Sequence, residues 1–137
     1  MAVTGGRNPV YTPGLKVSFA VSAAVTQGTL VEVTGNKTVG PASAASRKVV
    51  GVALQSADAV GDIIGVQLIG YIFTLTAEGA VAAGDELITA TGAGNEGHVS
   101  ALAAAAGATA GDINNARAVV GIALEAIADE ASGWVLV

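Results

Sequence analysis

The sequence predicts an all-β protein, a small β-barrel or sandwich-like domain made of two diverged repeats, with an extended N-terminal arm and at most one short helix. Eight short segments are rich in β-branched residues and are bounded by Gly, Asn or Asp, as strands usually are. One strand motif occurs twice, 70 positions apart. Pro and Gly are frequent in the first 14 residues, where they oppose regular strand pairing.

Residues 1–14 are predicted to form the extended arm. Arg7, Asn8 and Tyr11 are set among prolines that stiffen the chain, which suits a docking segment, and Lys16 adds a positive charge just behind them. Chain termini also commonly carry no fixed structure, and that alternative stays open. The docking interpretation predicts that these four side chains contact a partner.

Residues 15–137 are predicted to form one β-rich domain, because no break in composition divides them. Many short strands in one domain are typical of a barrel or a sandwich. The strand candidates in chain order are 15–21, 29–34, 49–55, 63–69, 71–76, 86–91, 119–125 and 133–137.

The repeated motif reads Val-Val-Gly-Val-Ala-Leu-Gln at 49–55 and Val-Val-Gly-Ile-Ala-Leu-Glu at 119–125. A similar turn precedes each copy and an apolar strand follows each, so the internal repeat covers about 25–70 and 81–137. Bulky apolar side chains alternate with small ones in both copies, and a strand that is apolar on both sides is usually buried on both faces. Both copies are therefore predicted to be core strands.

The one helix candidate is 99–106, where alanine gives a high helix propensity. Gly107 follows, and about eight residues are marginal for a helix. An Ala-rich loop is the alternative, and the sequence does not decide between helix and loop anywhere in 101–117.

Composition favours contacts with other proteins. Only 12% of the 137 residues are charged, and a soluble domain so poor in charge exposes apolar area, so we expect a homo-oligomer or a docked protein. The absence of cysteine excludes disulfides and thiolate metal sites. No apolar run reaches the roughly 18 residues of a membrane span, so we expect no contact with a membrane. The net charge of −5 disfavours binding to phosphates, so we expect no contact with nucleic acid.

The charge is unevenly distributed along the chain. Up to Lys48 there are five basic residues and one acid, a balance of +4, whereas the remainder has one base and ten acids, a balance of −9. Simple drift in surface charge accounts for this difference. The alternative is a basic N-terminal segment that docks on an acidic partner surface.

No catalytic residue, metal ligand or cofactor site is predicted, and the chain is expected not to be an enzyme. A G-x-G-x-x-G pattern at 92–97 imitates a dinucleotide fingerprint, but Glu96 would repel the pyrophosphate, so a hairpin loop is expected there. His98, the only histidine, has no recognisable nucleophile to serve. The acid pairs lack the spacing of a calcium loop; they are Asp58 with Asp62, Asp85 with Glu86, and Asp129 with Glu130.

Trp134 lies in the last strand candidate. Core packing is one role for it, and the other is to anchor an oligomer interface together with Val135. The few aromatic residues are too scattered to form a stacking platform visible in the sequence.

The order of five segments resembles the family of bacteriophage capsid cement or decoration proteins. They are Val-Val-Gly-Val-Ala-Leu at 49–54, the apolar stretch 65–75, Val-Ala-Ala-Gly-Asp at 81–85, Val-Gly-Ile-Ala-Leu at 120–124 and Gly-Trp-Val-Leu-Val at 133–137. The resemblance covers roughly 15–137. The Pro- and Gly-rich residues 1–14 and the Ala-rich stretch 101–117 depart from the family pattern.

The resemblance implies a structural virion protein that is made in the bacterial cytoplasm and binds the capsid surface. Such proteins are β-barrel-like, gather often as trimers on the expanded head, and stabilise it by adhesion to the major capsid protein. Arg7, Asn8, Tyr11 and Lys16 would then be the capsid-docking arm. The alternative function is a carbohydrate- or receptor-binding β domain of a phage head fibre or spike.

Overall fold

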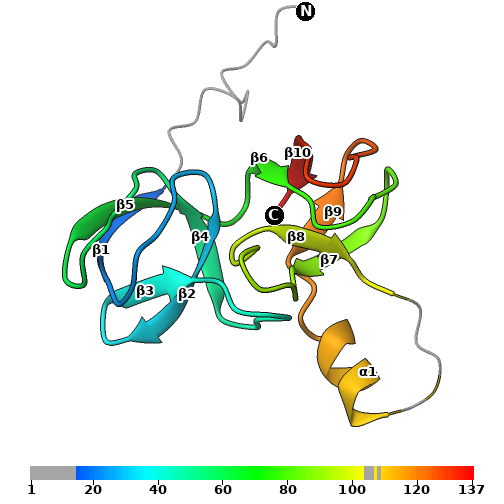
Figure 1. The fold of residues 1–137 in the computed structure, drawn as a ribbon, viewed down its shortest axis with the longest axis horizontal. Helices are drawn as coiled ribbons and strands as arrows, with labels where there is room; N and C mark the ends of the chain where they lie inside the picture. The colour runs from blue at the N-terminus through cyan, green and yellow to red at the C-terminus, as the bar shows by residue number, and fades with distance from the viewer. Residues whose placement is uncertain (1–14, 104–106, 108) are drawn as a thin grey trace, which may run out of the picture.

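The computed structural model describes residues 15–103, 107 and 109–137, and the predicted arm with Arg7, Asn8 and Tyr11 lies outside the described residues. The described part is mainly β, with ten strands and one short helix, which confirms the predicted all-β class. The strands form two halves that lie side by side, a closed barrel and a second five-stranded sheet (Figure 1).

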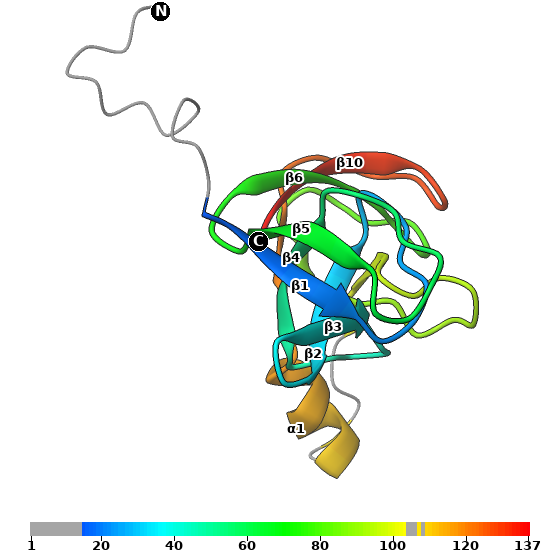
Figure 2. The same cartoon turned by 90° about the vertical axis from the view of Figure 1, so that its left-hand side faces the viewer.

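The first half is a closed barrel of five strands in the order β1-β3-β2-β4-β5. The pairs are antiparallel except that β1 and β3 close the barrel as a parallel pair. Figure 2 views the molecule from the side of this barrel. The strands are β1 (Lys16–Val21), β2 (Leu30–Gly35), β3 (Thr38–Pro41), β4 (Val49–Ala53) and β5 (Ile63–Leu68).

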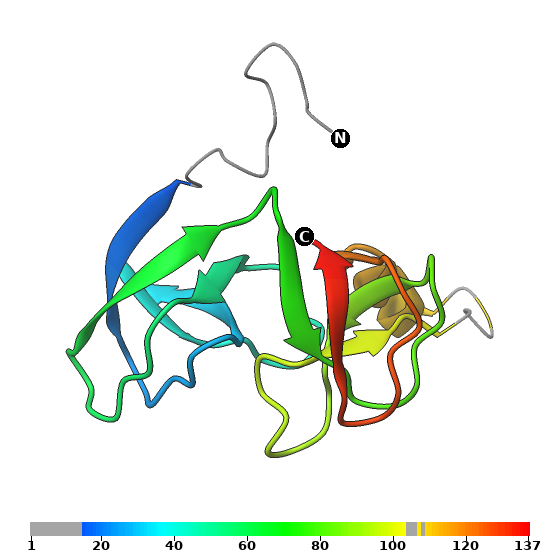
Figure 3. The ribbon, with the colours of Figure 1, turned by 90° about the horizontal axis from the view of Figure 1, so that it is seen from above.

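The second half has the same strand topology. Its order β6-β10-β9-β7-β8 corresponds position by position to β1-β5-β4-β2-β3 of the barrel. The parallel pair that closes the barrel is reduced here to one isolated parallel bridge between Ala77 and Val99. Figure 3 shows β6 and β10 side by side. The strands are β6 (Ile72–Thr76), β7 (Glu86–Thr89), β8 (Val99–Ala101), β9 (Gly121–Ala123) and β10 (Ser132–Leu136).

Hydrogen bonds define which residues are equivalent in the two halves. The Leu54 amide donates to the Gly65 carbonyl oxygen, and the Leu124 amide donates to that of Trp134, both at 2.9 Å. The loop after the repeated strand is therefore one residue shorter in the second half. Gly65 of β5 and Trp134 of β10 occupy the same place in the fold.

The strand pattern of the sequence does not reveal β3 and β8. β3 follows a tight turn in which Lys37 has a φ of 50°, and it contains Gly40 and ends at Pro41, two residue types that usually interrupt strands. β8 has only three residues. Both strands are held by pairing with other strands, β3 with β2 and β1 and β8 with β7, which the residue pattern of the strand itself does not record.

The helix alternative for 99–106 is wrong at its start, and residues 104–106 lie outside the described residues. Residues Val99–Ala101 form β8 instead, because antiparallel pairing with β7 buries Val99 completely. The helix α1 (Ala110–Ala116) begins later, where the Thr109 hydroxyl accepts from the Asp112 amide and the Asp112 carboxylate accepts from the Thr109 amide. This capping box, and not the alanine content, marks the start of the helix. Within the described residues, no helix is long and apolar enough to cross a bilayer.

The two halves differ in how their cores are filled. The core of the barrel consists only of barrel residues, among them Val31, Ile64 and Val66. The core of the second half also takes in Leu30, Ala42 and Val52, which project from the barrel. The core of the second half is therefore shared with side chains of the first, whereas the barrel's own core cluster contains no residue of the second half.

The prediction that both copies of the repeated strand are buried on both faces is wrong for the second copy. In β4, Val52 is 5% exposed because the second half covers it. In the second copy, Ile122 of β9 and Leu124 just after it are 42% and 43% exposed. Among the described residues, no segment packs on β9 in the way that the second half packs on β4, so the outer side of β9 stays exposed.

Candidate docking surfaces

The outer side of the second sheet carries large apolar side chains in register, which we call the apolar outer face. Leu136 of β10 lies directly opposite Ile72 of β6 on one side and Ile122 of β9 on the other. Trp134 is two residues before Leu136 on the same side of the strand, and Leu124 lies beside it. The apolar outer face consists of Ile72, Ile122, Leu124, Trp134 and Leu136, all between 42% and 59% exposed.

The structure separates the two residues predicted for an oligomer interface. Trp134 is 59% exposed on the apolar outer face, whereas Val135 is completely buried in the core of the second half. Successive side chains of a strand point to opposite faces, so only one of two neighbours can reach a partner. The interface remains a prediction, and Trp134 is the member of the pair that is available to it.

A second surface gathers positive charge in a protein that is acidic overall. Arg47 and Lys48 on the loop before β4 and Arg117 at the end of α1 line one open hollow, which we call the basic hollow. Its remaining lining residues are Ser43, Ala44, Ala45 and Ser46, and none of them is a carboxylate. Arg47 and Lys48 are about 70 positions from Arg117 in the chain, so the sequence does not show that these charges lie together.

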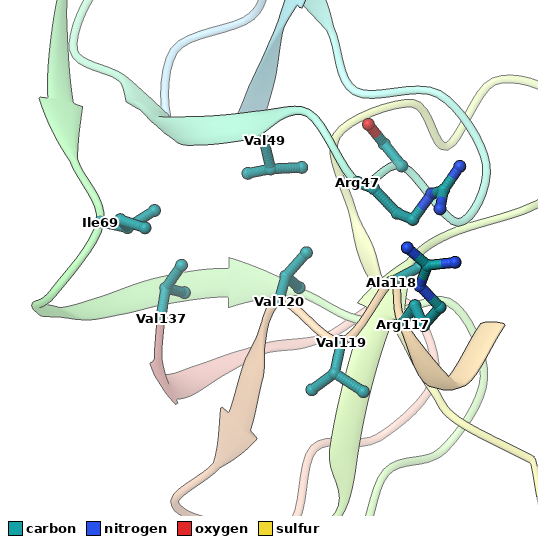
Figure 4. A pocket seen from close by; sticks show the side chains of 9 residues that line it. Arg47, Val49, Ile69, Arg117, Ala118, Val119, Val120 and Val137 are labelled. Carbon is teal, nitrogen blue, oxygen red and sulfur yellow. The ribbon is translucent and has the colours of Figure 1, made fainter. Parts of the chain in front are cut away.

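A narrower hollow of about 120 Å³ continues between the two halves. Val49, Val120 and Val137 line its apolar end, and Arg47 and Arg117 lie at the other end (Figure 4). Guanidinium groups bind carboxylates with two parallel hydrogen bonds, so an arginine pair beside an apolar floor suits an acidic peptide segment.

Buried hydrogen bonds hold the loop that carries Arg47. The Glu32 carboxylate accepts from the hydroxyls of Ser43 and Ser46, and Glu32 is itself buried. The Thr89 hydroxyl donates to the Ser43 carbonyl oxygen at 2.6 Å and accepts from the Ser46 amide at 2.7 Å. Glu32, a charged residue within an apolar strand, is the sequence signal that could have identified this site.

The glycine-rich pattern at 92–97 lies in the loop between β7 and β8, which confirms the expected hairpin loop. The Glu78 carboxylate fixes this loop by accepting from the Asn95 side chain and from the Thr91 and Gly92 amides. The hydrogen bond from Asn95, aided by those from Gly92 and Thr91, lowers the pKa of Glu78 below the ordinary value for glutamate.

The other predicted residues do not assemble into one site. Lys16 is exposed on β1. Two of the paired acids serve local turns, since Asp62 accepts from the Ala59 amide and Asp85 from the Ala82 amide. Asp129 instead accepts from the Gly79 amide, 50 positions away. In the part of the chain that the structure describes, no three His, Asp or Glu side chains lie close enough to hold a metal ion.

The fold is similar to that of a solved phage structure. The chain matches the N base of the head fiber gp8.5 of bacteriophage phi29 with a TM-score of 0.54 and 15% sequence identity. The match covers 90% of this chain and 92% of that chain, so both halves of the fold take part. No protein-family model and no curated protein matches the sequence.

Proposed function

We propose that this chain is a structural protein of a bacteriophage head. In this proposal it binds the outside of the capsid as a decoration protein, stabilises the capsid, and does so as a homotrimer. The observation that carries the proposal is the fold shared with a phage head fiber base over nine-tenths of both chains. Adhesion needs complementary surfaces and no reacting groups. The apolar outer face and the basic hollow are two such surfaces.

The proposed partner is the major capsid protein, and the basic hollow is the proposed contact with it. Arg47, Lys48 and Arg117 would bind carboxylates on the capsid surface, since each arginine offers a planar pair of donors. The arm residues Arg7, Asn8 and Tyr11, with Lys16 at the start of β1, would add a second contact. Many copies on one shell make even weak contacts effective, because binding sites that are linked act together.

The test uses heads of the phage whose genome carries this gene, purified without the chain. Wild-type protein is expected to sediment with the heads, and Arg47→Gln combined with Arg117→Gln is expected to weaken binding at least tenfold. Lys37→Gln is the matched control, because it removes a positive charge from an exposed turn outside the basic hollow. Deletion of residues 1–14 is expected to leave a folded protein that binds heads weakly.

Each outcome bears on a different part of the proposal. A wild-type protein that ignores expanded heads would overturn the function. Undiminished binding by the double arginine variant would remove the basic hollow from it, and undiminished binding without residues 1–14 would remove the arm.

A second candidate function is a carbohydrate- or receptor-binding domain of a phage head fibre or spike, and the similarity to the phi29 head fiber base favours the fibre location. Electron microscopy of bound heads separates the two functions, because a decoration protein adds compact density and a fibre base carries an elongated appendage. Binding to a glycan array that is lost on changing Tyr71 or Trp134 would support the second candidate.

A further inference from the structure

The apolar outer face is not required by the fold, and the chain itself provides the comparison. In the barrel, Lys16 of β1 pairs with Gln67 of β5, at the place that Ile72 and Leu136 occupy in the second half. A lysine and a glutamine are therefore compatible with this position of the sheet. The pairing of these two strands therefore does not itself require apolar residues at this place.

The same comparison holds one pair further along the strands. Ser18 of β1 pairs with Gly65 of β5, and Thr74 of β6 pairs with Trp134 of β10. The first half presents small residues at this place, and the second half presents the largest side chain of the chain, 59% exposed. Large exposed aromatic groups among aliphatic ones are typical of the centre of a protein interface.

Within one chain, the first copy of the repeated strand already has this side buried, because the second half of the chain packs on it. Val52 of β4 pairs with Leu30, and both are covered by the second half. The equivalent pair in the second half is Ile122 with Glu86, and both are exposed. The chain thus contains one covered and one uncovered example of the same strand surface.

We infer that the apolar outer face is the contact with a second copy of this chain. A second copy is the occupant we infer, because within one chain the corresponding strand surface of the barrel already packs on a half with the same strand topology. The five residues of the face carry no charge, and Glu86, which pairs with Ile122, lies exposed at its edge, where its carboxylate can stay in water. This inference deepens the homo-oligomer part of the proposed function and is independent of binding to heads.

The first half supplies the test variant. Ile72→Lys combined with Leu136→Gln places on the second half the residues that the barrel has at the equivalent positions, so the fold should tolerate both. The matched control is Ile63→Ser, a residue 66% exposed on β5, whose equivalent in β10 is Ser132. Light scattering is expected to give a multimer for wild type and control, and the 13.2 kDa mass of one chain for the double variant.

Trp134 is the only tryptophan, and it remains in all three proteins, so its fluorescence reports on the face directly. In the associated wild type its emission should lie at shorter wavelength and resist acrylamide quenching, and dilution should reverse both effects. The double variant should show the exposed emission at every concentration. Circular dichroism and thermal unfolding check that it is folded.

A wild-type protein that is a monomer at high concentration, or a folded double variant with the mass of the wild type, would overturn the inference. If the double variant does not fold, dilution of the wild type still decides, because Trp134 emission that ignores dissociation contradicts the proposed contact. A multimer that ignores heads would reject the proposed function and leave this inference intact.

Discussion

Gly121 lies against Leu136 so closely that a Cβ added at Gly121 would come within 2.2 Å of the Leu136 carbonyl oxygen. The barrel repeats this contact, since a Cβ at Gly51 would lie 2.0 Å from the Gln67 carbonyl oxygen. The two glycines of the repeated motif therefore allow two backbones to approach, once in each half.

Gly51→Ala and Gly121→Ala should each destabilise the protein by about 3 kcal/mol, because the obstacle is backbone and only a shift of the strand relieves it. Urea unfolding followed by circular dichroism measures the loss. Gly65→Ala is the control, since its Cβ would meet its nearest neighbour at an ordinary 3.6 Å. Equal midpoints for all three variants would contradict the close approach.

Thr89→Val should cost about 1–3 kcal/mol, because it keeps the shape of the side chain and leaves the Ser46 amide and the Ser43 carbonyl oxygen without their partner. The change should also loosen the loop that carries Arg47. Faster hydrogen exchange of the Ser46 amide, with that of the β10 amides unchanged, would separate this local effect from global destabilisation.

Leu30→Ala should destabilise the protein by about 2–5 kcal/mol, because Leu30 is completely buried in the core of the second half. Leu124→Ala, at a site 43% exposed, should lower the free energy of unfolding much less. This second change is made in the Ile72→Lys/Leu136→Gln protein, where association should not contribute. Thermal unfolding gives both values. Similar losses at the two sites would contradict the packing of one half by the other.

Glu78 should make stability depend on pH on the acid side. Its pKa is lowered in the folded protein, so its carboxylate contributes fully above the pKa of the unfolded chain, and the contribution is lost as pH falls through the lower folded value. The glutamine of the Glu78→Gln variant does not titrate, so its contribution to the free energy of unfolding does not change with pH. The difference in urea midpoint between wild type and variant should therefore be present at neutral pH and shrink in acid. A difference that grows in acid would contradict the sign.

Local sequence signals predict most of this fold, because each of eight strands combines a β-branched segment with turn residues at its ends. β8 cannot be predicted from its own three residues, because they become a strand only by pairing with β7. The basic hollow cannot be predicted either, because segments far apart in the chain form it. Ser43 and Thr89 are 46 positions apart, and Arg117 comes from a third segment. The residue type of Trp134 and its place in the last strand single it out in the sequence, whereas its apolar neighbours become apparent only from the register of three strands.

The one-sided packing of the cores has a consequence for biosynthesis. The ribosome delivers the N-terminal half first, and that half has a core cluster of its own within residues 19–68. The second half, delivered later, shares its core with Leu30, Ala42 and Val52 of the first half. The part of the chain that is synthesised first is thus the part that has a core cluster made only of its own residues.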